Sequence, residues 1–137
     1  MEIRPLRAEH FDERMALSQF AFQYTLTPEQ LEERRAWFRP EREWGVFEDG
    51  RLLAAMTLLP LEIWVHGRKM AMGGLAGVAT WPEARRRGCV DGLLRHGLET
   101  MRQAGQTVSM LYPFSFPFYR RYGWELTVER KTYTLEP

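Results

Sequence analysis

Three consecutive arginines, residues 85–87, stand directly before a glycine near the middle of the chain. They belong to the segment 80–90 (T-W-P-E-A-R-R-R-G-C-V), which separates a β-prone run from an amphipathic helical pattern. A helix begins with unpaired backbone N–H groups and the positive end of its dipole, so cations gathered there are unfavourable unless an anion lies between them. Gly88 allows the backbone to approach such a ligand closely. The segment therefore predicts a site for a phosphate or diphosphate group.

The arginine run also has a simpler explanation. Most runs of like charge form solvated surface, and this alternative remains open, above all for Arg87. Two other phosphate-binding motifs do not fit the spacing. The chain lacks G-x-x-x-x-G-K-S/T, and the glycines of residues 72–77 (M-G-G-L-A-G) do not open a helix as G-x-G-x-x-G does. The sequence therefore excludes a P-loop and a Rossmann-type loop.

The composition is that of one globular domain. The 137 residues, 45% of them hydrophobic, suffice for a single core and leave no room for a second domain. A formal net charge of +1 provides no overall basic field, so neither nucleic acid nor a membrane is expected as a partner. The single cysteine, Cys89, excludes an intrachain disulfide, and no metal is expected. The charged N-terminus and the absence of an apolar run of about 20 residues predict a cytoplasmic protein.

Turn and capping signals divide the chain into strands and helices. Asp49-Gly50 and His66-Gly67 favour tight hairpin turns, and Thr27 followed by Pro28 and Gln30 is typical of a helix start. The expected elements are a strand at 3–6, helices at 8–24 and 28–38, strands at 44–48, 52–65 and 69–80, a helix at 88–105, a strand at 107–112, a helix at 116–122 and a strand at 124–135. Helices and strands thus alternate irregularly, as in an α+β protein.

With this order of elements, the arginine segment resembles the pyrophosphate loop of the GNAT superfamily of acetyl-CoA-dependent N-acetyltransferases. Residues 85–90 (R-R-R-G-C-V) match its pattern Q/R-x-x-G-x-G/A except at Val90, and residues 118–124 (F-Y-R-R-Y-G-W) resemble the family's Y-x-x-x-G-F/Y/W segment. The resemblance covers essentially the whole chain. It implies a GNAT fold of the α/β (α+β) class, a mixed twisted sheet of about six to seven strands flanked by about four helices.

The V-A-T-x-P-x-x-R-R-R-G run that begins at Val78 is similar, more narrowly, to the N-terminal domain of the enhanced-intracellular-survival acetyltransferases. Those proteins are longer and carry a second GNAT-like domain and a sterol-carrier-like C-terminal domain, whose terminal carboxylate acts as the base. The resemblance implies that residues 1–137 form one GNAT domain, which stands alone or is a fragment of a longer multidomain protein. Trp37, Phe38 and Trp64 would then be exposed and cover a surface facing a second copy or missing C-terminal domains.

The resemblance implies acetyl transfer from acetyl-CoA, as co-substrate, directly to a primary amine of a small molecule or of a lysine side chain. The backbone of Val78 and Thr80 would pair with the pantetheine arm like an added strand, with an N–H near Val78 facing the thioester carbonyl. The diphosphate would be bound by Arg85, Arg86, Arg87, Gly88, Cys89 and Val90 through arginine side chains and backbone N–H groups.

Tyr119 corresponds to the family's tyrosine that donates a proton to the departing CoA thiolate. A phenol with a pKa of about 10 can protonate a thiolate whose acid has a pKa of about 8.5. Packing in an aromatic cluster is its alternative role. Glu62 and Glu125 are candidate carboxylates for a general base, but neither is assigned. A GNAT-like module that binds CoA without turnover, or serves as a structural part of a larger assembly, is the alternative function.

Overall fold

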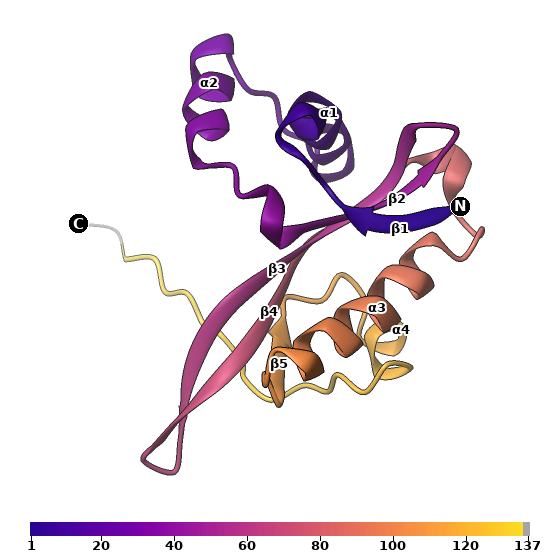
Figure 1. Cartoon of the computed structure of the whole chain (residues 1–137). Coiled ribbons are helices and arrows are strands. Elements are labelled where there is room, and N and C mark those ends of the chain that lie inside the picture. Colours follow the sequence, from indigo (N-terminus) through magenta and orange to yellow (C-terminus); the bar gives the residue numbers. More distant parts are fainter. Residues whose placement is uncertain (136–137) are drawn as a thin grey trace.

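The computed structural model describes residues 1–135 and shows a sheet with helices on both faces (Figure 1). Within these residues the sheet contains five strands in sequential order, β1 (Glu2–Pro5), β2 (Glu43–Glu48), β3 (Arg51–Val65), β4 (Arg68–Thr80) and β5 (Val108–Leu111). The same residues form four α-helices, α1 (Phe11–Phe22), α2 (Pro28–Trp37), α3 (Cys89–Gln103) and α4 (Phe116–Arg120). Neighbouring strands are antiparallel except β4 and β5, which are parallel. The sheet is therefore mixed, as the sequence predicts.

Local sequence signals explain where several elements begin and turn. The Thr27 side chain accepts a hydrogen bond from the Gln30 N–H at 3.3 Å, and Gln30 Oε1 accepts one from the Thr27 N–H at 2.9 Å. This reciprocal cap starts α2. Asp49 and Gly50, between β2 and β3, both have positive φ angles, as do the two residues between β3 and β4. The predicted hairpins and helix cap are confirmed.

Two apolar cores, one on each face of the sheet, join the layers. On one face, Leu93 and Leu94 of α3 are fully buried against strand residues such as Met56. On the other face, Leu17 of α1 packs with Leu52. Figure 1 shows α1 and α2 on one side of the sheet and α3 and α4 on the other. Burial of each such side chain contributes about 1.5–3 kcal/mol, so the three layers are held together mainly by these contacts.

Strand β4 contains a bulge and, towards its C-terminal end, separates from strand β5. Gly77 and Val78 together lie opposite Met56 of β3, and Gly77 has a φ of 58°, which is typical of a bulge that begins with glycine. Strand β5 pairs with residues 72–75 of β4, whereas within residues 1–135 the following part of β4, residues 76–80, pairs only with β3. The sheet therefore opens between β4 and β5 at the C-terminal end of β4.

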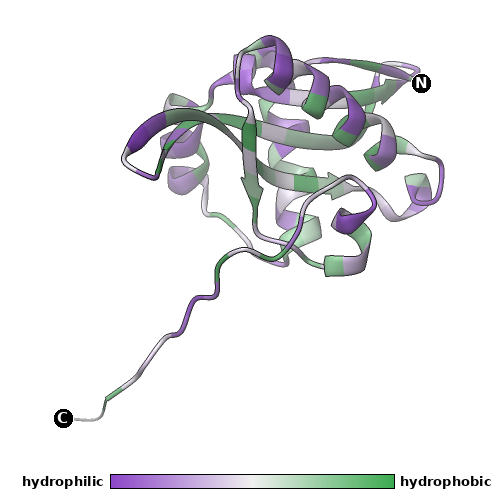
Figure 2. Ribbon diagram, turned by 90° about the horizontal axis from the view of Figure 1, so that it is seen from below, coloured by the Kyte–Doolittle hydropathy of each residue, from purple (hydrophilic) through white to green (hydrophobic). Residues whose placement is uncertain are grey.

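The sheet is smaller than the sequence predicts. Six to seven strands were expected, but residues 1–135 form five, and the predicted strand at 124–135 lies in an extended tail that leaves the sheet (Figure 2). Leu126, Val128, Tyr133 and Leu135 of this tail are exposed. A β-prone run needs a neighbouring strand to satisfy its backbone, and the pattern of its own residues does not supply one.

The three aromatic side chains expected to be exposed behave differently. Trp37 and Trp64 are exposed, 73% and 70% respectively. Phe38 is half-buried because its ring packs edge-on against Phe11 at a centroid distance of 5.3 Å. The prediction is therefore wrong for Phe38, which belongs to the core beneath α1.

Candidate active site

The turn between β4 and α3 contains the predicted diphosphate loop. A short 3-10 turn, Pro82–Ala84, leads into residues 85–88, which are exposed. Gly88 precedes the first turn of α3 with a φ of 81°, a conformation that glycine adopts without strain, and Arg86 has a φ of 61°. The first N–H groups of α3 have no partner within the helix and face this turn. The turn therefore presents arginine side chains together with backbone N–H groups that have no partner within the helix.

The three arginines of this turn differ in their partners. Arg87 Nη2 donates to both carboxylate oxygens of Glu48, at 2.7 and 2.8 Å, and this bond lowers the pKa of Glu48 below its ordinary value. Arg85 and Arg86 form no ion pair with any residue between 1 and 135. These two guanidinium groups are thus available to an anion, whereas Arg87 already has one.

Cys89 and Val90 face the core with their side chains. The Cys89 thiol is buried, with its Sγ 3.7 Å from the carbonyl oxygen of Ala84, and burial raises the pKa of the thiol. A buried thiol of high pKa is a poor nucleophile. Val90 is half-buried and packs against the same core cluster. Both residues can therefore contribute to a bound anion only through their backbone N–H groups.

Tyr119 is buried on α4, 4% exposed, among other aromatic rings. The rings of Phe114 and Phe118 lie 5.3 and 5.2 Å from it, both edge-on. Burial raises the pKa of the phenol above its ordinary value near 10. The apolar cluster that contains Tyr119 also packs against Val78. Tyr119 therefore lies on the face of the sheet that the Val78 side chain covers, near the C-terminal end of β4.

A hydrogen bond ties the segment around Tyr119 to the arginine turn. The Tyr122 hydroxyl donates to Asp91 Oδ1 at 2.8 Å, and Arg95 Nε donates to Asp91 Oδ2 at 3.0 Å. The bond from Tyr122 is the main cause that lowers the pKa of Asp91. Because Asp91 is in the first turn of α3, the predicted loop and Tyr119 lie at one end of the molecule. This tie was not predicted from the sequence.

Val78 and Thr80 lie on the open part of β4. Val78 is the second residue of the bulge, and its side chain is half-buried. The Thr80 hydroxyl oxygen is buried without a hydrogen-bond partner among residues 1–135. Together with the turn at 85–88, these residues form a continuous path from the open edge of β4 to the start of α3.

The two carboxylates considered as bases lie elsewhere. Glu62 is an exposed residue of β3 that pairs with Lys69 at 2.7 Å. Glu125 is exposed and pairs with Arg120, also at 2.7 Å, which lowers the pKa of Glu125. Both carboxylates belong to surface ion pairs that do not involve Tyr119 or the turn at 85–88.

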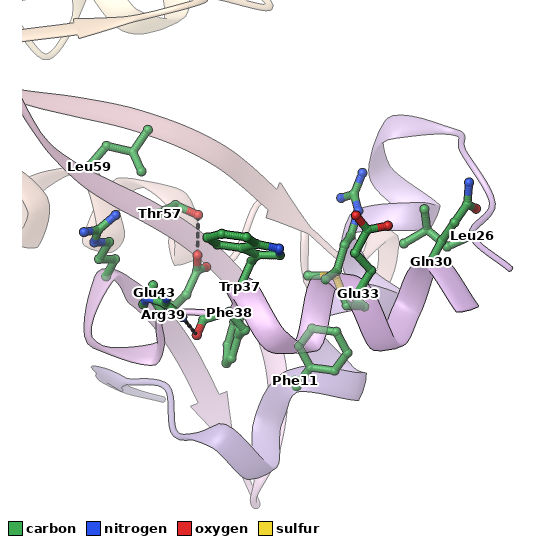
Figure 3. A pocket seen from close by; sticks show the side chains of 13 residues that line it. Phe11, Leu26, Gln30, Glu33, Trp37, Phe38, Arg39, Glu43, Thr57 and Leu59 are labelled. Atoms are coloured by element: carbon green, nitrogen blue, oxygen red, sulfur yellow. Dashed lines mark hydrogen bonds between the residues drawn. The ribbon is translucent and has the colours of Figure 1, made fainter. Parts of the chain in front are cut away.

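A cavity of about 540 Å³ lies on the α1 and α2 side of the sheet (Figure 3). Its walls combine aromatic rings, including Phe11 and Trp37, with the carboxylates of Glu33 and Glu43. Arginine side chains also border it, namely Arg34, Arg39 and Arg42. A cavity of this size and mixed lining is suited to a polar small molecule or a single side chain.

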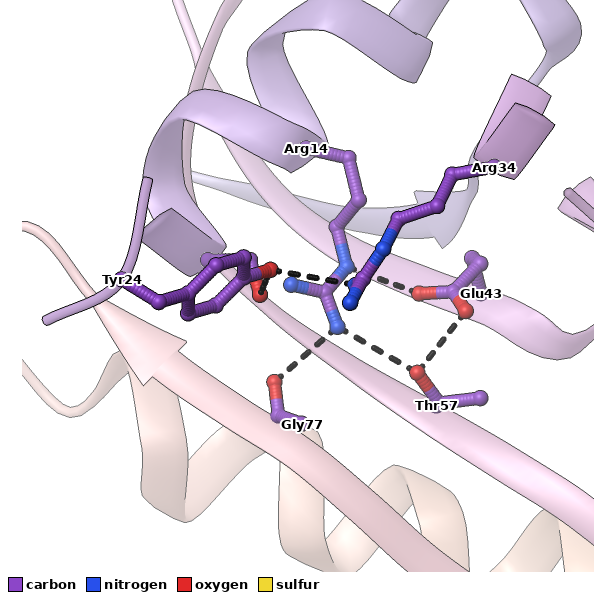
Figure 4. A network of polar contacts seen from close by, with 7 residues as sticks. Arg14, Tyr24, Arg34, Glu43, Thr57 and Gly77 are labelled. Atoms are coloured by element: carbon purple, nitrogen blue, oxygen red, sulfur yellow. Dashed lines mark hydrogen bonds and ion pairs between the residues drawn. The ribbon is translucent and has the colours of Figure 1, made fainter. Parts of the chain in front are cut away.

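A buried polar network links this cavity to the bulge of β4 (Figure 4). Arg14 Nε donates to Glu43 Oε2 at 2.8 Å, and the Thr57 hydroxyl donates to Glu43 Oε1 at 2.8 Å. Arg14 Nη2 donates to Thr57 Oγ1 at 3.2 Å and to the carbonyl oxygen of Gly77 at 3.1 Å. One guanidinium therefore joins α1, β2, β3 and β4.

This network is not among the sites predicted from the sequence, although the sequence contains a signal for it. Arg14 lies three residues after Phe11 and three before Leu17, both of which are completely buried. A charged residue on the apolar face of a helix is buried with it and requires polar partners. The helical spacing therefore marks Arg14, but it does not indicate which residues it contacts.

No helix within residues 1–135 combines the length and the apolar character that a membrane span needs. No three His, Cys, Asp or Glu side chains within residues 1–135 are grouped so that they could hold a metal ion.

Residues 2–127 match the acetyltransferase (GNAT) domain family, and the chain belongs to this family. An uncharacterized N-acetyltransferase of Streptomyces avermitilis is 25% identical over 99% of this chain and 33% of its own length. A second, from Streptomyces griseus, is 30% identical over 77% of this chain and 28% of its own length. The chain thus spans about a third of the length of the curated relatives it matches.

Solved structures show the same fold. A probable N-acyltransferase of Enterococcus faecalis superposes with a TM-score of 0.82 at 28% identity, over 90% of this chain and 32% of its own. Eis1 of Mycobacterium abscessus gives 0.78 at 21% identity, over 90% of this chain and 31% of its own. A predicted acetyltransferase of Clostridium acetobutylicum, solved with acetyl-CoA, gives 0.78 at 14% identity and covers 97% and 95%. These matches confirm the predicted GNAT fold and the similarity to the enhanced-intracellular-survival proteins.

Proposed function

We propose that this chain, as one GNAT domain, binds acetyl-CoA along residues 76–90 and transfers its acetyl group directly to a primary amine. One observation carries the proposal: the open edge of β4 continues into a turn at the start of α3, where Arg85 and Arg86 have no acidic partner among residues 1–135. That arrangement suits a ligand with an extended amide-containing arm and a diphosphate. Acetyl-CoA has both, and the Clostridium acetobutylicum protein of the same fold was solved with it.

The backbone of residues 76–80 supplies the donor site. Since β5 pairs with β4 only up to residue 75, the amide groups of the pantetheine arm can take the place of a neighbouring strand. The N–H of Val78, within the bulge, faces the thioester carbonyl in this arrangement. The diphosphate binds Arg85 and Arg86 through charge-assisted hydrogen bonds and the first N–H groups of α3 through its oxygens.

The cavity beneath α1 and α2 holds the acceptor. The carboxylate of Glu33 and the indole of Trp37 suit a cationic amine, either of a small molecule or of a lysine side chain. The charge of Glu43, by contrast, is already matched by Arg14. Glu43 and Thr57 line the cavity and also belong to the network that reaches Gly77. The side chain of Arg14 therefore connects the acceptor site to the backbone that binds the thioester.

The reaction then needs an oxyanion donor and a proton source. The unprotonated amine attacks the thioester carbonyl, and the negative charge that develops on its oxygen is stabilised by the Val78 N–H. When the C–S bond breaks, the thiolate takes the proton of the Tyr119 phenol. The proton that leaves the new amide nitrogen passes to solvent, and the tyrosinate regains a proton from solvent. A phenol is protonated at neutral pH, as a proton donor requires, and burial raises the pKa of Tyr119 further.

An amine screen tests the proposal. Release of free CoA thiol from acetyl-CoA is measured with a panel of small-molecule amines and lysine-containing peptides, and the acetylated products are identified by mass spectrometry. We expect thiol release that depends on both acetyl-CoA and one class of amine. Binding of acetyl-CoA without release across the whole panel would contradict the proposal and favour a non-catalytic CoA-binding module.

The raised pKa of Tyr119 predicts the alkaline limit of the reaction. The protonated phenol is the active form, so activity is retained below its folded pKa and lost above it. Because burial raises that pKa above its ordinary value near 10, kcat at saturating amine should rise with pH as the bound amine loses its proton, and should fall only above pH 10. The kcat profile of the wild type between pH 7 and pH 10.5 checks this. A fall centred below pH 9 would exclude Tyr119 as the group that limits the rate.

A further inference from the structure

Stability alone does not explain the buried network around Arg14. The side chain is 4% exposed, and its Nη1 is buried without a partner among residues 1–135. Burying an ion pair costs about as much as the attraction returns, and apolar side chains of similar volume fill such a space at least as favourably. A buried guanidinium with unused donors therefore points to a role in placing the groups that it does contact.

The group placed by Arg14 is the bulge of β4. Arg14 Nη2 donates to the Gly77 carbonyl oxygen at 3.1 Å, and a Cβ on Gly77 would collide with the guanidinium. A side chain at position 77 would also be strained by the φ of 58°. The lack of a side chain at Gly77 therefore makes room for the Arg14 guanidinium to reach the bulge.

Fixing the Gly77 carbonyl also fixes the next N–H. The C=O of Gly77 and the N–H of Val78 belong to one planar trans peptide unit, in which they point in opposite directions. A carbonyl held towards Arg14, on the α1 side, therefore holds the Val78 N–H away from it. This inference rests on the proposed function, in which the Val78 N–H faces the thioester carbonyl.

We infer that Arg14 is a positioning residue, which aims the Val78 N–H at the thioester oxygen through its bond to Gly77. The same side chain holds Glu43 and Thr57, which line the acceptor cavity. It therefore sets the position of the oxyanion donor relative to the acceptor amine. Arg14 itself touches neither substrate.

The variant Arg14→Lys separates positioning from charge. A lysine ammonium keeps a positive charge beside Glu43, but it lacks the planar fork that reaches Glu43 and Gly77 together. We expect kcat to fall by between about tenfold and about 100-fold, since a misplacement on the order of 1 Å is that costly. The KM for acetyl-CoA should change by less than about threefold, because the interaction is used in the transition state. Arg102→Lys, on the exposed face of α3, is the matched control and should retain wild-type kcat.

A double variant covers the case in which Arg14→Lys does not fold. Arg14→Met with Glu43→Met removes the ion pair without leaving an unpaired buried charge, so the thermal unfolding midpoint should stay near that of the wild type. Its kcat should still fall by about tenfold or more. A folded Arg14→Lys or double variant whose kcat lies within about twofold of the wild-type value would overturn the inference.

An NMR measurement keeps the inference separate from the proposed function. The residual dipolar coupling of the Val78 N–H reports the orientation of its peptide plane without any ligand. If the wild type binds no acetyl-CoA, the proposed function fails, and this coupling alone decides the role of Arg14. A changed coupling in Arg14→Lys, with unchanged couplings along α3, would support positioning of the bulge, and an unchanged coupling would overturn it.

Discussion

Tyr119→Phe is expected to lower kcat by about 100-fold while the affinity for acetyl-CoA stays close to that of the wild type. Loss of a positioned general acid costs about 100-fold to 10,000-fold in rate, and the lower end applies because water can partly replace a phenol. Phenylalanine keeps the aromatic contacts with Phe114 and Phe118, so the fold should be retained. Steady-state thiol release and calorimetric titration of acetyl-CoA measure the two quantities.

The matched control for this variant is Tyr112→Phe. Tyr112 is 88% exposed, in the segment that connects β5 to α4, and its hydroxyl lies in solvent. Its loss should leave kcat unchanged. A Tyr119→Phe protein that retains more than half of the wild-type kcat would show that Tyr119 has only a packing role.

Glu43→Gln should destabilise the fold by about 3–5 kcal/mol, because it leaves the Arg14 guanidinium buried without a counter-charge. That is a large part of the stability of a domain of this size, which is on the order of 5–15 kcal/mol. Urea unfolding followed by tryptophan fluorescence measures the free energy of unfolding. Adding Arg14→Met should recover most of the loss, since the buried charge is then removed.

The control for the effect of charge is Glu62→Gln on β3, which breaks the exposed pair with Lys69 of β4. Exposed pairs contribute little, so this variant should unfold at nearly the same urea concentration as the wild type. Equal unfolding midpoints for Glu43→Gln and Glu62→Gln would mean that the Arg14 and Glu43 pair does not stabilise the fold.

Much of the fold could be predicted from the sequence because local chemistry determines it. Asp49-Gly50 adopts the positive φ angles of a hairpin turn whatever strands it joins, and Thr27 with Gln30 caps α2 without help from other elements. The arginine turn at 85–88 could be predicted for the same reason, since its position between a strand and a helix is visible in the sequence.

The network around Arg14 could not be predicted because its contacts are distant in sequence. Arg14 donates hydrogen bonds to Glu43, Thr57 and Gly77, on three different strands. These partners lie 29, 43 and 63 positions further along the chain. Helical periodicity marks Arg14 as buried but does not indicate which acid, hydroxyl or carbonyl it meets. The predicted last strand failed for a related reason, since the β-prone residues 124–135 require a neighbouring strand that their own pattern does not specify.

Calorimetric titration of acetyl-CoA into the whole chain tests most directly that residues 76–90 bind this co-substrate. The wild type is compared with the double variant Arg86→Ala, Gly88→Asp, which removes one guanidinium and places a carboxylate where the diphosphate binds. We expect a wild-type Kd on the order of 1–100 μM and a loss of at least about 100-fold in the double variant, since each charge-assisted hydrogen bond contributes about 1.5–3 kcal/mol. The exposed Arg102→Ala is the control and should bind like the wild type. A folded wild-type protein that gives no binding heat and no displaceable acetyl-CoA, or a double variant that binds equally well, would contradict the proposed site.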